Sequence, residues 1–148
     1  YYASAGDKFV TDRCTVECLY PFYGDMTAEE NEGSLVLKAD IDGIKILFTG
    51  DIEYEDETRL MDSDIECDII KIAHHGSNTS SSADFIEKTN ADIAVIEAGK
   101  NNIYGFPHKQ VIDTLEEYDI EIYITGENGA VKVVLEKDGY DVKTYKGR

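Results

Sequence analysis

Apolar and polar residues alternate near both ends of the chain, which is the pattern of β-strands with one buried face. The alternation predicts strands at Lys8–Val10, Thr15–Leu19, Ser34–Asp40, Ile44–Thr49, Glu121–Thr125, Ala130–Glu136 and Tyr140–Tyr145. Between the second and third of these, the polar stretch Tyr20–Glu32 is typical of a loop. Hairpin turns are expected at the dipeptides Asp42-Gly43, Asn128-Gly129 and Asp138-Gly139, which favour tight turns between antiparallel strands.

The middle of the chain shows nearly continuous apolar runs separated by amphipathic segments. Asp68–Ala73 and Ile93–Glu97 are mostly apolar, as in strands that are buried on both faces. Helices are predicted at Glu55–Met61, Ser80–Thr89 and Pro107–Tyr118, with Pro107 suited to the first turn of the last one. Strands and helices in this order predict one layered α/β domain over residues 1–148.

Composition and charge then narrow the class of protein. The chain is 42% hydrophobic and 30% charged, as in globular rather than disordered proteins. Its formal net charge of −17 argues against a domain that grips nucleic acid by itself, because such domains are usually basic. The excess of acidic residues has two interpretations. It is either a solvated surface, or some of these residues face metal cations. No apolar run approaches the ~18–20 residues that span a bilayer, so we expect no direct membrane contact from this segment.

Two further features concern the chain as a whole. Cys14, Cys18 and Cys67 form no CxxC pair, and free thiols are expected in preference to a zinc knuckle or a disulfide. The sequence does not begin with Met, so we expect it to be part of a longer protein.

Candidate metal ligands follow two of the predicted central strands. Asp51 comes directly after Ile44–Thr49 and Gly50, and the pair His74–His75 ends the next strand. Because ligands bind outside the carboxyl ends of strands in open α/β sheets, these side chains are expected at one edge. Carboxylate oxygen and imidazole nitrogen are donors that suit Zn or Mn. The alternative is a turn residue for Asp51 and packed histidines for the pair.

The neighbouring loops carry residues that suit a phosphate or a leaving group. Ser77 and Thr79 precede a predicted helix, where hydroxyl and N–H groups either cap the helix or meet an anion. Lys100 and Asn102 follow the strand Ile93–Glu97, and they are read as anion contacts or as a solvated loop. His108 is read as a metal ligand, as a general acid or as a surface residue.

Several motifs taken together resemble one known family. They are Asn31-Glu32-Gly33-Ser34-Leu35-Val36-Leu37, Leu47-Phe48-Thr49-Gly50-Asp51-Ile52-Glu53, Ile70-Lys71-Ile72-Ala73-His74-His75-Gly76-Ser77, Gly99-Lys100-Asn101-Asn102-x-Tyr104-Gly105 and Glu127-Asn128-Gly129-Ala130. In this order, over essentially the whole chain, they resemble the metallo-β-lactamase-like domain of the ComEC family. That family comprises competence DNA-uptake channel proteins and their free-standing relatives.

The resemblance implies a portion of a metallo-β-lactamase-like αββα sandwich and a hydrolase that uses one or two divalent metals. Asp51 would then be the metal-bridging carboxylate, and one histidine of the His74–His75 pair would be a late ligand. Metal-bound hydroxide would attack a phosphodiester. The role implied is degradation of the non-transported DNA strand, at the outer face of the cell membrane, or as a secreted protein.

Three departures from the family pattern affect the site. No histidine precedes position 74, so the HxHxDH motif of the superfamily is absent, and the N-terminal part of the domain is expected to be missing. Gly105-Phe106-Pro107 stands where many relatives read Gly-His-Pro, with His108 as a possible substitute. Asn31 stands where many of these folds carry another histidine.

Three hypotheses remain open from the sequence. The first is a nuclease-like phosphodiester hydrolase for DNA uptake, inactive as this chain alone because the divalent metal is not fully bound. The second is a non-catalytic accessory domain. The third is a hydrolase of small phosphodiesters on the same fold. A half-sandwich also leaves a sheet edge uncovered, so a homodimer through that edge is expected.

Overall fold

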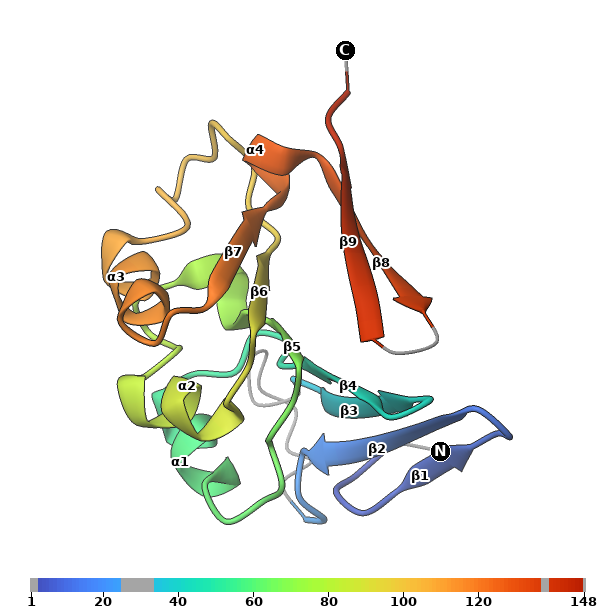
Figure 1. The fold of residues 1–148 in the computed structure, drawn as a ribbon. Helices are drawn as coiled ribbons and strands as arrows, with labels where there is room; N and C mark the ends of the chain where they lie inside the picture. The colour runs from blue at the N-terminus through green and yellow to red at the C-terminus, as the bar shows by residue number, and fades with distance from the viewer. Residues whose placement is uncertain (1–2, 25–33, 137–138, 148) are drawn as a thin grey trace.

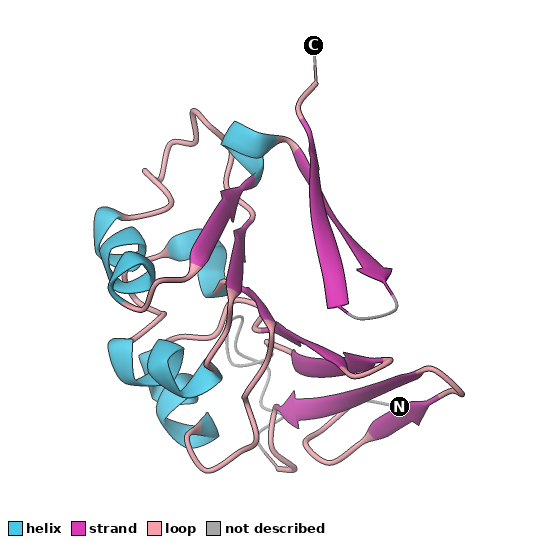
Figure 2. Cartoon of the chain, in the orientation of Figure 1, coloured by secondary structure: helices cyan, strands magenta, loops and turns pink. Residues whose placement is uncertain are grey.

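The strands predicted from apolar runs and most of those predicted from alternation lie in one seven-stranded sheet (Figures 1 and 2). The computed structural model describes residues 3–24, 34–136 and 139–147. The strands of this sheet are β1 (Lys8–Val10), β2 (Cys14–Tyr20), β3 (Val36–Ile41), β4 (Ile44–Phe48), β5 (Ile69–Lys71), β6 (Ile93–Ile96) and β7 (Glu121–Ile124). They are neighbours in chain order; the pairs from β1 to β4 are antiparallel, and those from β4 to β7 are parallel.

The hairpin between β3 and β4 confirms the turn predicted at Asp42-Gly43. Ile41 pairs with Ile44, which leaves two residues in the loop. Asp42 and Gly43 both have positive φ, 53° and 91°. This is the left-handed backbone that a type I′ turn requires, and Asp and Gly adopt it more readily than other residues.

The main helices cover one face of the sheet (Figure 2). They are α1 (Tyr54–Leu60), α2 (Ala83–Thr89) and α3 (Lys109–Glu117). Beneath them lies a continuous apolar core to which the central strands contribute Leu47, Ile70 and Ile96, each at most 1% exposed. Burial of this kind stabilises the domain by about 25 cal/mol per Å² of apolar surface removed from water.

A buried carboxylate, rather than a serine hydroxyl, satisfies the start of α2. Glu57 of α1 is 1% exposed, and its carboxylate accepts hydrogen bonds from the backbone N–H groups of Ser81 and Ser82. The helix therefore begins at Ala83 instead of Ser80, and its N-cap Ser82 makes no side-chain capping bond. Burial raises the pKa of Glu57, and the hydrogen bonds from Ser82 and Ser81 oppose this effect.

The start of α3 also differs from the prediction. Helix α3 begins at Lys109 with His108 as its N-cap, so Pro107 precedes the helix and is not in its first turn. His108 N–H donates to the carbonyl of Gly76 at 2.8 Å. The residues before the helix are thus tied to the loop after β5.

The end of the chain forms a separate small sheet, and the hairpin predicted at Asn128-Gly129 is wrong. Asn128 Oδ1 accepts the backbone N–H of Ile124 at 2.8 Å, which closes the short helix α4 (Thr125–Asn128). Among the described residues, the strands β8 (Ala130–Glu136) and β9 (Gly139–Tyr145) pair only with each other. Their pairing of Glu136 with Gly139 agrees with a hairpin turn there, although Asp138 itself lies outside the described residues.

Two expectations about the chain as a whole can be compared with the structure. All three cysteines are free, with Cys18 and Cys67 buried and Cys14 partly exposed. Burial raises the pKa of the Cys67 thiol to about 12. Within the described parts of the chain, every helix is too short or too polar to cross a membrane.

Candidate functional site

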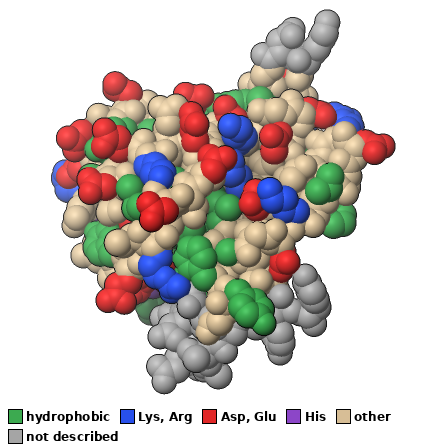
Figure 3. All heavy atoms as spheres, turned by 90° about the horizontal axis from the view of Figure 1, so that it is seen from below, with side chains coloured by type: hydrophobic (Ala, Val, Ile, Leu, Met, Phe, Trp, Pro, Cys, Tyr) green, Lys and Arg blue, Asp and Glu red, His purple; other side chains and the backbone are tan. Residues whose placement is uncertain are grey.

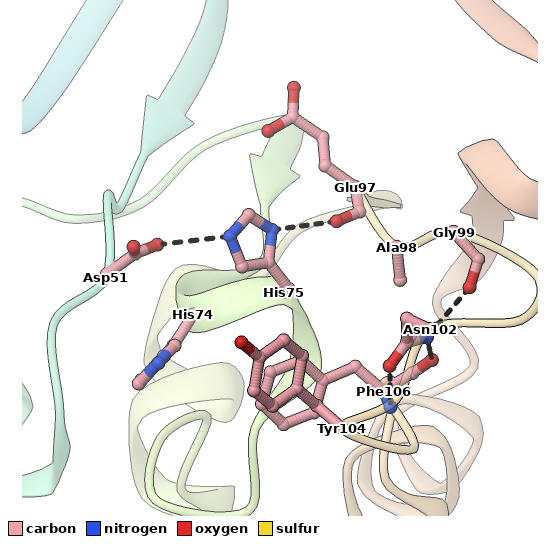
Figure 4. A pocket seen from close by; sticks show the side chains of 9 residues that line it. All are labelled: Asp51, His74, His75, Glu97, Ala98, Gly99, Asn102, Tyr104 and Phe106. Carbon is pink, nitrogen blue, oxygen red and sulfur yellow. Dashed lines mark hydrogen bonds and ion pairs between the residues drawn. The ribbon is translucent and has the colours of Figure 1, made fainter.

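The loops that follow β4, β5 and β6 meet in one pocket at the carboxyl edge of the sheet (Figure 4). The pocket has a volume of about 500 Å³. Its lining is formed by Asp51, His74, His75, Glu97, Ala98, Gly99, Asn102, Tyr104 and Phe106. Consecutive parallel strands place their carboxyl ends at the same edge, which explains why loops distant in sequence converge here.

His75 and Asp51 face each other across this pocket (Figure 4). His75 Nδ1 lies 2.7 Å from the backbone carbonyl oxygen of Glu97. A carbonyl only accepts hydrogen bonds, so Nδ1 carries the proton when the ring is neutral, and Nε2 keeps its lone pair. That Nε2 lies 4.0 Å from Asp51 Oδ1. Imidazole and carboxylate therefore present two donor atoms to the same space.

An unusual backbone conformation aims the two histidines. His74 and His75 have φ values of 46° and 57°, and Gly76 follows with a φ of 84°. Three consecutive residues in the left-handed region are costly for non-glycine positions, on the order of 1–3 kcal/mol each. Tertiary contacts hold this run in place: His74 N–H donates to the Gly50 carbonyl, and the Gly76 carbonyl accepts from His108.

His74 has an unsatisfied ring nitrogen. Its Nδ1 is the buried side-chain nitrogen that lacks a hydrogen-bond partner among the described residues. Glu53 Oε1 lies 3.6 Å from this nitrogen, beyond hydrogen-bond distance. Since a buried polar atom without a partner is costly, this nitrogen suits an incoming ligand such as a metal ion.

Glu53 and Glu97 were not among the candidate residues predicted from the sequence. Glu53 could have been predicted from the sequence, because it follows Asp51 by two residues in the same loop. Glu97 contacts His75 through its backbone carbonyl. Every residue has such a carbonyl, so the residue type at position 97 could not predict this contact.

An aromatic stack forms one wall of the pocket. The rings of Tyr104 and Phe106 are stacked, with centroids 5.6 Å apart and planes 20° apart. Phe106 in turn stacks on the imidazole of His75, at 6.5 Å and 23°. Phe106 therefore occupies the position where the resemblance had suggested a histidine, and it supports the ring of a candidate ligand.

The side chain of Asn102 shapes the loop that carries this stack. Its Nδ2 donates to the carbonyls of Gly99 and Phe106 at 2.7 and 2.6 Å, and its Oδ1 accepts Phe106 N–H at 2.9 Å. Asn102 lines the pocket, as predicted from its loop. However, these bonds occupy most of its amide, so in this structure it organises the loop.

The other predicted residues lie around the pocket without lining it. His108 Nδ1 accepts the backbone N–H of Asn78 at 2.9 Å, and its ring meets Phe106 edge-on. Ser77 is buried and lies 3.0 Å from Thr79, oxygen to oxygen. Lys100 is exposed. Roles for these four residues in binding phosphate or in proton transfer stay predictions.

The donor atoms at this edge do not make up a metal-binding cluster by themselves. Among residues 3–24, 34–136 and 139–147, no cluster of three or more His, Cys, Asp or Glu side chains is arranged to hold a metal ion. Asp51 and His75 are the pair whose donors face one another, with His74 beside them. Asn31, the further position raised by the sequence, lies outside the described residues.

Curated proteins with similar sequences are competence proteins. The chain is 37% identical to ComE operon protein 3 of Bacillus subtilis over 107 residues, which is 71% of this chain and 14% of the relative. It is 30% identical to Recombination protein 2 of Haemophilus influenzae, over 80% of this chain and 15% of the relative. Competence protein ComA of Neisseria gonorrhoeae is also 30% identical, over 75% of this chain and 16% of the relative.

These matches confirm the resemblance to competence proteins, and the chain spans about a seventh of their length. No protein-family profile matches the chain.

A solved structure confirms the α/β fold class. A protein of Parabacteroides distasonis, named as a metal-dependent hydrolase, superimposes with a TM-score of 0.54 at 16% identity, over 84% of this chain and 56% of that protein. A protein of Thermotoga maritima, named as a Zn-dependent hydrolase of the metallo-β-lactamase superfamily, has a TM-score of 0.45 at 12% identity, over 82% of this chain and 70% of that protein. The first of these likenesses shows that the chain shares the α/β fold of part of that protein.

Proposed function

We propose, from its homology to a segment of competence proteins, that this chain is part of a metal-dependent phosphodiester hydrolase that acts on DNA during uptake. The observation that supports the proposal most directly is the placement of His75. Its Nδ1 is held by the Glu97 carbonyl, and its Nε2 faces Asp51. Ligating histidines in proteins commonly donate their second nitrogen to a carbonyl in this way.

The donor atoms present fit a divalent metal. His75 Nε2 and Asp51 Oδ1 lie 4.0 Å apart, compared with about 3.5 Å between two donors of one tetrahedral ion. A shift of about half an ångström in these side chains would let one ion bind both atoms. His74 adds a buried nitrogen with no hydrogen-bond partner among the described residues. When bound, a divalent metal would polarise a phosphoryl oxygen and lower the pKa of a coordinated water.

The chain's own residues would bind and orient in this scheme. Asp51 and His75 would hold the ion, and the Glu97 carbonyl would fix the tautomer and direction of the imidazole. Phe106 packs on the other side of the same ring. Further ligands must come from outside the described residues, because two or three donors leave a divalent site weak.

Metal binding by the 148-residue chain tests the assignment of ligands. We expect one weak Mn²⁺ site in titration calorimetry, which Asp51→Ala and His75→Ala each abolish. Asp113→Ala is a matched control, because Asp113 is a carboxylate on α3 that pairs with Lys109 away from the pocket. If Mn²⁺ bound equally well to the Asp51 variant, the proposed site would be wrong, and a non-catalytic accessory domain would be favoured.

Hydrolysis requires a more complete site than metal binding does. We expect no cleavage of DNA by this chain alone with added Mn²⁺, and cleavage by a longer protein that also supplies an HxHxDH motif. Asp51→Ala in that longer protein should lower the rate by about 100-fold, the upper end of the roughly 10–100-fold loss seen when a group that supports a ligand is removed. Cleavage by the isolated chain that depended on Asp51 would contradict the expectation of an incomplete site.

Small phosphodiesters are the second candidate substrate class. The described lining of the pocket contains acidic, aromatic and amide groups but neither Lys nor Arg. Away from the pocket, Figure 3 shows Asp and Glu spread over the face of the molecule seen from below, with Lys and Arg scattered among them. A domain that binds DNA through phosphates needs a basic surface. Rates on small phosphodiesters that do not change with salt, without DNA cleavage, would select this candidate.

A further inference from the structure

We propose that the exposed ring of Tyr104 is a stacking platform for a nucleobase, which makes single-stranded nucleic acid the substrate class of the pocket. The proposal rests on the proposed function, because it places a base beside the phosphodiester that Asp51 and His75 would serve. It goes further by naming the residue that would recognise the substrate and the chemical group that it would recognise.

The geometry of the aromatic wall carries this inference. Tyr104, Phe106 and His75 form a continuous stack with interplanar angles of 20° and 23°. His75 is the ring at one end, and it faces Asp51. Tyr104 is the ring at the other end, and it is 68% exposed. A flat heteroaromatic ring would extend this stack by one member, at the mouth of the pocket (Figure 4).

The platform is held in place before any ligand binds. Asn102 makes three side-chain hydrogen bonds within its own loop, two of them to the backbone of Phe106. The ring of Phe106 is also in contact with His74, His75 and His108. An exposed tyrosine on so constrained a loop loses little conformational freedom when a base stacks on it, so more of the stacking energy is available for binding.

Packing of the loop alone does not account for the exposure of Tyr104. A ring whose only role was to stabilise the loop would be expected to bury its apolar surface. However, more than half of the Tyr104 side chain is exposed to solvent. The adjacent Ile103 is 90% exposed and enlarges the apolar rim. Exposed apolar groups that cluster beside a pocket commonly mark a place where a ligand binds.

The charge of the site favours recognition of a base over recognition of phosphate. The part of the lining that the structure describes contains Asp51 and Glu97 but neither Lys nor Arg. Without cationic side chains, a nucleotide gains little from its phosphate in the absence of metal. Base–aromatic stacking contributes about 1–3 kcal/mol per base and is tolerant of sequence. Binding should therefore depend on the presence of bases, vary little with base identity, and respond weakly to salt.

The absence of tryptophan from this chain permits a direct test. Tyr104→Trp introduces a single indole at the platform, and Tyr145→Trp places one at an exposed tyrosine on β9, outside the pocket lining. A short single-stranded oligodeoxynucleotide is titrated into each variant, next to an abasic oligomer of equal length and charge. We expect saturable quenching of the indole only for Tyr104→Trp with the oligomer that has bases.

Affinity measurements complete the test on the otherwise unchanged chain. In fluorescence anisotropy with a labelled oligomer, Tyr104→Ala should weaken binding about ten-fold, within the range for loss of one stacked base. Tyr104→Phe keeps a flat ring and should bind like the unchanged chain. Equal binding of the abasic oligomer, no loss in Tyr104→Ala, or no binding by any variant would each overturn the proposal.

The two proposals fail separately. Asp51→Ala should abolish Mn²⁺ binding yet leave the quenching in Tyr104→Trp intact, because stacking needs no metal. If Mn²⁺ binding did not depend on Asp51 while base-dependent quenching was retained, the metal-dependent hydrolase alone would be refuted. Asp51-dependent Mn²⁺ binding without base-dependent quenching would refute the stacking platform alone, and it would favour small phosphodiesters.

Discussion

Replacing Gly76 by alanine tests whether the left-handed run at His74–Gly76 is what shapes the site. A Cβ atom at position 76 would lie 2.6 Å from Pro107 Cβ and 3.0 Å from Pro107 Cα, and the φ of 84° is itself unfavourable for alanine. The backbone contributes roughly 1–2 kcal/mol. Forcing a methyl group against a proline ring, which cannot rotate away, adds about 1–3 kcal/mol. We therefore expect Gly76→Ala to lower the free energy of unfolding by about 2–5 kcal/mol.

Gly105→Ala separates the two causes. Gly105 has a similar φ of 74°, but no atom lies within 4 Å of an added Cβ. It should lose only the backbone contribution, roughly 1–2 kcal/mol. Urea unfolding of both variants, followed by circular dichroism, measures the difference, and Mn²⁺ titration should show weaker binding for Gly76→Ala because His75 precedes the displaced residue. Equal destabilisation of both variants would refute the argument that contact with Pro107 holds the turn.

Further predictions concern stability, thiol chemistry and assembly. Because the pKa of Glu57 is raised, this side chain keeps its proton to higher pH in the folded than in the unfolded state. Its contribution to stability should therefore fall as the pH rises above 4.5, the ordinary pKa of a glutamate. Glu57→Gln should flatten this part of the pH profile of urea unfolding. Cys14 should react first with a thiol reagent, while buried Cys67, whose pKa is about 12, should react only on unfolding. Fast labelling of a folded Cys14→Ser variant would contradict this order of reaction. The edge strand β1 exposes Phe9, so light scattering should show a dimer that Phe9→Lys disrupts, and a monomeric unchanged chain would refute the expectation.

Much of the fold follows from periodicity alone. Alternation locates β3 and β4, and the turn at Asp42-Gly43 has the left-handed backbone that its two residues favour. Continuous apolar runs locate β5 and β6 in the interior of the sheet. Because parallel neighbours end at one edge, the sequence also brings Asp51, His75 and Asn102 to a common pocket.

Contacts between side chains and distant backbone groups are what the sequence does not reveal. Glu57 meets the start of α2 across 24 residues, and His75 meets the Glu97 carbonyl across 22. Neither contact follows from local propensity, since each depends on how the elements pack. Asn128 is the reverse case: its dipeptide with Gly129 favours a hairpin, but its own side chain bonds to Ile124 and forms a helical turn instead.

Phe106, which stands where many relatives carry a histidine, gives the pocket an aromatic wall in place of a further candidate metal ligand. A histidine here would add a further nitrogen close to His75, whereas the phenyl ring adds an apolar surface that the imidazole of His75 and the ring of Tyr104 both use. The substitution thus gives up a possible ligand and gains a rigid aromatic wall. In the proposed scheme, a site with few donors, no cationic lining among the described residues and an exposed stacked ring would select its ligand by the flat face of a base more than by charge. Stacking and metal binding would then act on separate parts of one substrate, the base and its neighbouring phosphodiester, which is the arrangement that a single-strand nuclease would require.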